Sequence, residues 1–223
     1  MKRIIQLTDD GSQTINVAET NITYNSTYGA IQESMHVFIN AGLQPLLNTK
    51  NELHIFEMGF GTGLNVLLTL QEAIQHKQKI YYYSIDLFPL EKEIYEQLDY
   101  TTQLNNQDLQ TYFSKLHSCN WEEEVCIHPL FTFYKSLTSL MDFSTPKQFD
   151  LIYFDAFDPA AQPELWTETI FHKLFSMLVP DGVLTTYSSK GNVRRAMQAS
   201  GFTVQKLKGA TGKREMVRAI KKV

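Results

Sequence analysis

Residues 56–65 read FEMGFGTGLN, and this stretch decides the fold because it joins a short apolar run, Leu53–Met58, to a helical pattern over Leu64–Ile74. Its glycines, Gly59, Gly61 and Gly63, allow a tight turn and let a ligand approach with no Cβ in the way. The spacing G-x-G-x-G differs from the G-x-G-x-x-G of dinucleotide sites and from the G-K-[ST] of phosphate loops. The stretch predicts a strand, a ligand-binding loop and a helix, against the alternative of a glycine-rich turn without a ligand.

Strand-like and helical patterns alternate after this loop. Only residues 208–214 separate the last two strand-like segments, which is too short for a helical crossover, so these two should pair antiparallel. The alternation predicts an α/β fold with a mostly parallel, seven-stranded sheet, similar to the Rossmann-like methyltransferase fold. The expected strands are 53–58, 80–85, 130–134, 149–154, 183–187, 202–207 and 215–220, and the expected helices are 64–74, 91–98, 108–116, 137–143, 163–178 and 191–200.

The first residues carry a different pattern. Two strand-like segments, 3–7 and 14–18, flank the turn signal Asp10-Gly11, and a helical pattern over 31–41 follows them. We therefore expect an N-terminal hairpin and helix extension over residues 1–45, followed by a Rossmann-like domain over residues 46–223.

Composition indicates a globular protein. The chain has 223 residues, of which 43% are hydrophobic and 20% charged. No apolar run approaches the ~18 residues needed to cross a bilayer, and two acids, Asp9 and Asp10, precede any long apolar stretch, so we expect neither a signal peptide nor a membrane partner. The two cysteines, Cys119 and Cys126, lack the spacing of zinc pairs, so no metal site is predicted. These features favour a cytoplasmic protein.

Charge is distributed unevenly along the chain. Residues 190–223 contain ten Lys or Arg and one acid, whereas the whole chain has a net charge of −4. A polyanion such as a nucleic acid is attracted to a segment of this kind, although some of these charges can simply be solvated faces of helices and strands.

Three acids follow predicted strands. Glu57 lies within E-x-G-x-G-x-G, a spacing that S-adenosyl-L-methionine sites use, and an acid suits that cationic ligand. Asp86 ends the next strand, where a carboxylate can accept hydrogen bonds from both ribose hydroxyls, unless it only caps a helix. Since ligands bind at the carboxyl ends of strands in open α/β sheets, Glu57, Asp86 and Asp155 should share one crevice.

The third acid belongs to the sequence FDAFDP, residues 154–159. Such loops are similar to those of enzymes that methylate exocyclic amines. Asp155 can hold an amine and take its proton, and Phe157 can stack on a base. The competing interpretations are a loop-capping carboxylate and a core aromatic ring.

Together these stretches resemble the methyltransferase domain of the MnmC family, which modifies the wobble uridine of tRNA. The matching stretches are residues 27–29 (TYG), 56–67, 85–90 (IDLFPL), 154–159 with 163–167, and 189–216. The resemblance implies N-methylation of 5-aminomethyl-(2-thio)uridine to 5-methylaminomethyl-(2-thio)uridine. It implies tRNA as partner, S-adenosyl-L-methionine as cofactor, and, as candidate partners, the enzymes that install the aminomethyl group.

The resemblance also assigns roles to residues. Asp155 matches the catalytic acid. The residues expected to bind the cofactor are Tyr28, Glu57, Gly59, Gly61, Gly63, Asn65 and Asp86. The residues expected to contact the substrate or tRNA are Phe157, Lys190, Arg194, Arg195, Lys213 and Arg214.

Three departures from the family pattern are visible. Asp86 stands where the bifunctional relatives tend to have Glu, a mild change for ribose binding. Tyr134-Lys135 stand where relatives have a Gly-Asp pair whose acid contacts adenine. The fused oxidase domain of the bifunctional relatives has no counterpart, so the substrate should already be the free aminomethyl form. Two other functions compete with this hypothesis: a small-molecule amine transferase, such as an aminopropyltransferase, and a catalytically silent RNA-binding module.

Overall fold

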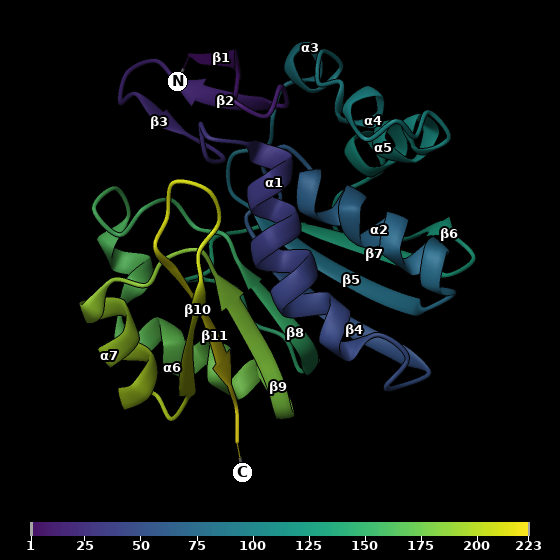
Figure 1. Ribbon diagram of the computed structural model, residues 1–223. Helices are drawn as coiled ribbons and strands as arrows, with labels where there is room; N and C mark the ends of the chain where they lie inside the picture. The colour runs from purple at the N-terminus through teal and green to yellow at the C-terminus, as the bar shows by residue number, and fades with distance from the viewer. Residues whose placement is uncertain (1, 223) are drawn as a thin grey trace.

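The computed structural model describes residues 2–222, which form two separate sheets (Figure 1). The larger has eight strands in the order β10-β11-β9-β8-β4-β5-β7-β6. Its strands are β4 (Glu52–Met58), β5 (Lys79–Asp86), β6 (Glu124–His128), β7 (Phe131–Leu137), β8 (Phe149–Phe154), β9 (Leu178–Thr186), β10 (Thr203–Lys208) and β11 (Glu215–Ile220). Strands β9, β8, β4, β5 and β7 are parallel neighbours, and β11 pairs antiparallel with β9 and β10. The predicted mostly parallel sheet with a late antiparallel strand is confirmed.

The predicted number of seven strands is wrong, because β6 adds an eighth strand at the edge. It pairs antiparallel with β7 and contains an irregularity between Cys126 and His128. Of its five residues only Ile127 is buried. An edge strand with one face open to water needs no continuous apolar run, so the amino acids of β6 carry little signal for a strand.

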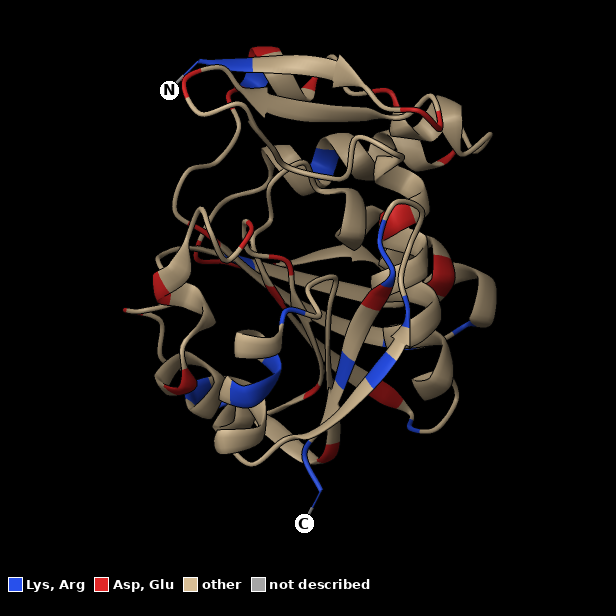
Figure 2. Ribbon diagram, turned by 60° about the vertical axis from the view of Figure 1, so that its left-hand side comes forward, with Lys and Arg blue, Asp and Glu red and all other residues tan. Residues whose placement is uncertain are grey.

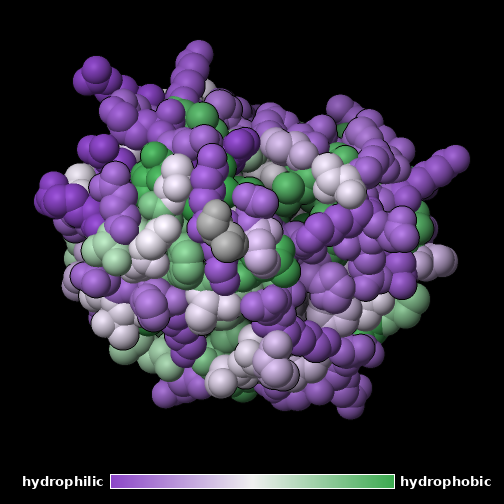
Figure 3. Space-filling view, turned by 90° about the horizontal axis from the view of Figure 1, so that it is seen from below, coloured by the Kyte–Doolittle hydropathy of each residue, from purple (hydrophilic) through white to green (hydrophobic). Residues whose placement is uncertain are grey.

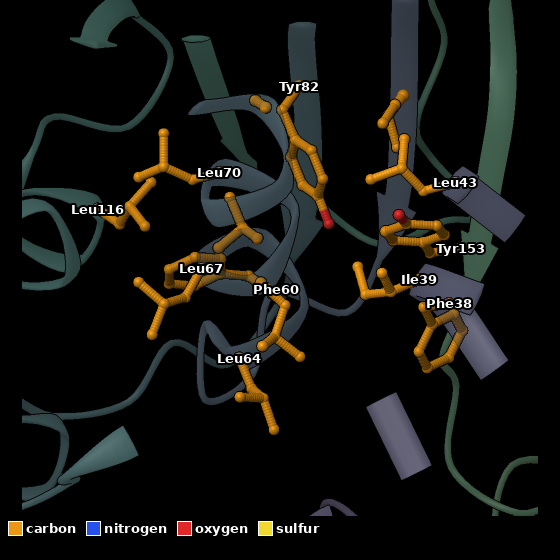
Figure 4. Close-up of a cluster of buried hydrophobic side chains, with 14 of the residues drawn as sticks. Phe38, Ile39, Leu43, Phe60, Leu64, Leu67, Leu70, Tyr82, Leu116 and Tyr153 are labelled. Atoms are coloured by element: carbon orange, nitrogen blue, oxygen red, sulfur yellow. The ribbon is translucent and has the colours of Figure 1, made fainter. Parts of the chain in front are cut away.

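Both faces of the central strands are buried, which explains their continuous apolar sequences. All six residues of β8 are buried, and its five apolar or aromatic side chains are shared between two cores. One core joins the sheet to the helical segment Ala30–Leu43, α2 (Leu64–His76) and α5 (Leu109–Ser118); Figure 4 shows part of it, including Phe38, Leu67, Tyr82, Leu116 and Tyr153. The other joins the sheet to α6 (Glu168–Met177) and α7 (Gly191–Ala199).

Helical segments differ from the sequence expectations at several places. Residues 138–142 form turns rather than the expected helix, because Ser139 and Asp142 bond to each other and so favour a local turn (Ser139 Oγ to Asp142 Oδ2, 2.6 Å). The expected helix 163–178 is a 3₁₀ turn, η3 (Pro163–Trp166), followed by α6. The first helix begins as α1 (Ala30–Ser34) and continues as a π-helix, η1 (Met35–Leu43). The remaining short helices are η2 (Gln44–Leu46), α3 (Lys92–Tyr95) and α4 (Tyr100–Gln103).

The N-terminal strands form the second sheet, β1 (Arg3–Leu7), β2 (Gln13–Val17) and β3 (Ile22–Thr23), which stands apart from the large one in Figure 1. Arg3 anchors it by donating hydrogen bonds to the carbonyl oxygens of Phe88 and Pro89, just after β5. Segment η1, in contrast, packs on the large sheet, where Gly42 lies against Thr185 and Leu151. A division of the chain at residue 45 stays a prediction.

None of the helices within residues 2–222 is long and apolar enough to cross a bilayer. Hydrophilic side chains cover most of the face seen in Figure 3, and hydrophobic ones appear between them in small groups. Apolar surface distributed in this way is normal for globular proteins.

Lys135 is a buried lysine in the middle of β7. Its Nζ donates to the carbonyl oxygens of Leu116 (2.9 Å) and His117 (2.7 Å) at the end of α5, and lies 4.7 Å from the centroid of the Trp121 ring. Burial lowers the pKa of Lys135. The side chain therefore caps the carboxyl end of α5.

We expect Lys135→Met to lower the free energy of unfolding by about 1–3 kcal/mol, because two buried carbonyl groups lose their donor. Urea denaturation measures the change, and Lys92→Met, at an exposed lysine, should stay within about 0.5 kcal/mol of the wild type. Equal stability of both variants would show that the cap contributes nothing.

Candidate active site

A cavity of about 210 Å³ opens at the carboxyl ends of β4, β5 and β8. Six of the predicted site residues line it: Gly59, Gly61, Asn65, Asp86, Asp155 and Phe157. They come from the loop after β4, the start of α2 and the ends of β5 and β8. The parallel sheet thus brings together residues that lie far apart in the chain.

The glycine loop requires glycine at each of its three positions. Gly59, Gly61 and Gly63 have φ angles of 95°, 50° and 74°, in the left-handed region. A Cβ on Gly59 would lie 3.1 Å from the carbonyl oxygen of Asp155, and one on Gly63 would lie 2.8 Å from Nε2 of His117. Gly63 itself does not line the cavity, so its part is to shape the loop.

Asp86 ties the glycine loop to the end of β5. One carboxylate oxygen accepts the N–H of Gly61 (2.8 Å) and the other accepts the N–H of Phe88 (2.7 Å). Burial raises the pKa of Asp86, and these two backbone donors oppose that change. Because a carboxylate has about four lone-pair sites, the group keeps acceptor capacity for a ligand.

Glu57 lies behind the cavity wall and is fully buried. The Oε2 atom of Glu57 accepts a hydrogen bond from the hydroxyl of Ser84 (2.8 Å). The Oε1 atom of Glu57 has no hydrogen-bond partner, and neither has the Oδ1 atom of Asn65. Burial raises the pKa of Glu57 to about 8. An unpaired buried acceptor of this kind is costly and marks a place where a donor or a cation would be stabilising.

Asp155 lines the cavity from the end of β8. Its Oδ2 accepts a hydrogen bond from Nδ2 of Asn65 (2.9 Å). Burial raises the pKa of Asp155 to about 7, and the nearby charge of Glu33 acts in the same direction. A carboxyl group near neutrality can both accept and release a proton at physiological pH.

Phe157 is fixed at the edge of the cavity by two contacts. Its carbonyl oxygen accepts the indole N–H of Trp166 (2.9 Å), and its ring lies edge-on to that of Tyr24, with centroids 5.2 Å apart. Phe157 lines the cavity and belongs to neither hydrophobic core.

Other predicted residues lie outside the cavity. Tyr28 is 51% exposed, and its ring covers Gly212, so the structure does not bring it to the predicted cofactor site. Lys190 pairs with Asp158 (2.6 Å). Arg194 and Arg195 lie on α7, and Lys213 and Arg214 lie in the turn between β10 and β11. Figure 2 shows Lys and Arg on α7 and, apart from these, along the β10–β11 hairpin.

Part of the cavity wall is formed by residues that the sequence did not predict. Tyr24 and Asn25 reach it from the segment after β3, and residues 138–141 reach it from the end of β7. The second group had a usable signal: β7 lies beside β5, and the N–H of Thr138 donates to the carbonyl oxygen of Asp86 (3.1 Å). Tyr24 and Asn25 had no such sequence signal, because their position depends on how the N-terminal sheet packs against the rest of the protein.

A parallel sheet with a late antiparallel strand, a glycine loop after β4 and acids after β5 and β8 define the class of Rossmann-like methyltransferases. The family model of S-adenosyl-L-methionine-dependent methyltransferases matches residues 97–222, so the chain belongs to that family. S-adenosyl-L-methionine is accordingly its cofactor, as the sequence predicted.

Solved structures share the fold. MnmC2 from Aquifex aeolicus matches all of this chain and 71% of its own, with a TM-score of 0.80 and 21% identity. Spermidine synthase from Thermotoga maritima matches 98% of this chain and 69% of its own, with a TM-score of 0.50 and 16% identity. At these identities the comparisons establish a common architecture.

The residues present fit this cofactor. Its sulfonium and amino groups are cationic, and the cavity region holds three buried or partly buried acids and two unpartnered oxygen acceptors. The loop backbone is accessible because its glycines lack side chains. Residues 2–222 contain no group of three or more His, Cys, Asp or Glu that could hold a metal ion.

We expect Asp86→Asn to raise the Kd for S-adenosyl-L-methionine about 10–100-fold, because an amide cannot accept from both backbone donors and from a ligand as a carboxylate does. Isothermal titration calorimetry measures this. The matched control is Asp158→Asn, outside the cavity wall. An unchanged Kd for Asp86→Asn would remove Asp86 from the cofactor site.

Proposed function

We propose that this methyltransferase acts on the amine of 5-aminomethyl-(2-thio)uridine at the wobble position of tRNA and forms 5-methylaminomethyl-(2-thio)uridine. The observation that carries the proposal is Asp155, a carboxyl group with a pKa of about 7 in the same cavity wall as Asp86, beside the Phe157 ring. The MnmC-like motifs and the similarity to MnmC2 support this choice of substrate.

When bound, S-adenosyl-L-methionine supplies an electrophilic methyl group. Asp86 is assigned to the ribose hydroxyls, and Asn65 with Glu57 to the cationic amino-acid end. Asp155 accepts a hydrogen bond from the acceptor amine and removes its proton, which frees the nitrogen lone pair. The nitrogen–carbon bond forms as the carbon–sulfur bond breaks, and the proton passes from Asp155 to water. Positioning contributes much of the rate enhancement in such an in-line displacement.

Phe157 supplies a surface for the nucleobase. Single-stranded loops of RNA are recognised by bases that leave the stack and lie on aromatic side chains. Phe157 follows Asp155 by two residues and lines the same cavity, so a base held there would place its 5-substituent near the carboxyl group.

The RNA backbone is assigned to the basic surface formed by Lys190, Arg194, Arg195 and Arg214. Arg194 is partly buried and donates through Nε to the carbonyl oxygen of Ser189 (3.1 Å), while Arg195 and Arg214 are exposed. Arginine side chains bind phosphate oxygens well because of their planar donors.

The main alternative is a small-molecule amine transferase, which the shared fold of spermidine synthase keeps in consideration. A polyamine acceptor is cationic, and the excess of Lys and Arg over acids in residues 190–223 disfavours it. A silent RNA-binding module would not need three acids beside one cavity.

The reaction is tested with tRNA from cells that stop at the 5-aminomethyl stage. We expect the wobble nucleoside to gain the mass of one methylene in the presence of S-adenosyl-L-methionine, and Asp155→Asn to lower turnover about 10²–10⁴-fold. The variant should still bind the cofactor. No mass gain by the wild type would refute the substrate, and near-normal turnover by the variant would refute the role of Asp155.

For the basic surface we expect Arg194→Gln/Arg195→Gln to weaken tRNA binding and to reduce the slope of log K against log salt by about 1 for each phosphate that the variant no longer neutralises. Filter binding across a salt series measures this. Lys77→Gln/Lys79→Gln removes the same charge at the amino end of β5, and the two slopes should differ. If the two double variants had equal salt slopes, Arg194 and Arg195 would not be phosphate contacts.

A further inference from the structure

Lys213 differs from the exposed basic residues of the C-terminal segment because its charge points inward. Its Nζ forms an ion pair with the carboxylate of Glu33 and lies 3.8 Å from the centroid of the Tyr187 ring. The side chain of Glu33 is only 8% exposed. Lys206 on β10, in contrast, pairs with Glu215 on the surface (2.8 Å).

The turn that carries Lys213 is fixed to α1 and η1. Nε2 of Gln32 donates to the hydroxyl of Thr211 (2.5 Å), and Nε2 of His36 lies 2.7 Å from the carbonyl oxygen of Lys208. The ring of Tyr28 covers Gly212. These contacts hold the ammonium group in one place and leave it little freedom to follow an RNA phosphate.

The same contacts lead to Asp155. Tyr187, under the ammonium group, donates its hydroxyl to the carbonyl oxygen of Ala156 (2.8 Å), the residue after Asp155. Glu33 is held from its other side by the N–H of Ser26 (2.9 Å). The charges of Glu33 and Lys213 both act on Asp155, with opposite signs.

The other groups around Asp155 can be named element by element. Glu57 on β4 is a buried acid, and the charge of Asp155 helps to raise the pKa of Glu57. Tyr82 on β5 is a buried phenol and Tyr187 after β9 a partly buried one, and both have raised pKa values, so they are neutral at pH 7. Asn65 on α2 donates a neutral hydrogen bond. Lys213 is thus the cation that acts directly on Asp155 among these neighbours.

We propose that Lys213 is a positioning residue of the active site rather than a phosphate contact, and that with Glu33 it forms a fixed charge pair that sets how readily Asp155 takes the proton of the acceptor amine. The inference deepens the proposed function, since it rests on Asp155 as the group that receives that proton.

The charge pair makes a signed prediction. Without the lysine, the unpaired Glu33 carboxylate disfavours the ionised form of Asp155, so the pKa of Asp155 rises above about 7. Without the glutamate charge, the unpaired ammonium favours the ionised form and the pKa falls. When both charges are removed the two effects oppose each other.

The test is a ¹³C NMR titration of the Asp155 carboxyl in the full chain, with Asp155→Asn assigning the resonance. We expect Lys213→Met to raise the pKa and Glu33→Gln to lower it, each by at least about half a unit, and the double variant to return near the wild type. The glutamine in Glu33→Gln keeps a side-chain oxygen that can accept the hydrogen bond from the N–H of Ser26. Lys206→Met should cause no shift. Shifts of one sign in both single variants, or none, would overturn the inference.

Two features keep this test decisive. The titration needs neither cofactor nor tRNA, so a failure of the proposed substrate leaves its result standing. If Lys213→Met does not fold, Glu33→Gln alone still carries a signed outcome. In the methylation assay, Lys213→Met should lower kcat and leave the salt slope of tRNA binding unchanged; a slope reduced by about 1 would restore Lys213 as a phosphate contact.

Discussion

The carboxylate of Asp86 is the interaction on which the site depends. By accepting the N–H groups of Gly61 and Phe88, it joins the loop after β4 to the end of β5. Once the loop is held there, Gly59 lies against the backbone of Asp155 and the ring of Tyr24 lies over Gly61. The loop is thereby bounded from three sides, and left-handed glycines are the residues that fit such a path without strain.

Placing acids in so apolar a cavity has an energetic cost. Burial raises the pKa values of Glu57, Asp86 and Asp155, which means that the folded protein resists ionising them. Binding a cation there offsets this cost, and anything that binds only the folded state stabilises it. The cavity is therefore organised for its cofactor rather than for the stability of the empty protein, a pattern typical of functional sites.

The sequence predicted best what a parallel sheet determines by itself. Strand ends meet at one edge, so Glu57, Asp86 and Asp155 could be placed in one region without knowledge of side-chain packing. It predicted poorly what depends on docking between distant segments. Tyr24 lines the cavity only because Arg3 anchors the N-terminal sheet beside β5, and Lys135 caps α5 only because β7 passes beneath it. Neither arrangement leaves a local pattern in the chain.

The net charge of a segment likewise does not show where its charged side chains lie in the fold. The basic C-terminal segment suggested one surface for a polyanion, but its charges serve different purposes in the fold. Lys206 pairs with Glu215, Lys213 with Glu33, and Lys221 lies over the Phe175 ring while donating to the carbonyl oxygen of Leu178 (2.7 Å). The proposed RNA surface is therefore smaller than the sequence suggested and lies on α7 and the β10–β11 turn. Because this turn packs against α1, an RNA held there would lie beside the segment that carries Glu33, so that substrate binding and the charge pair next to Asp155 depend on the same piece of structure.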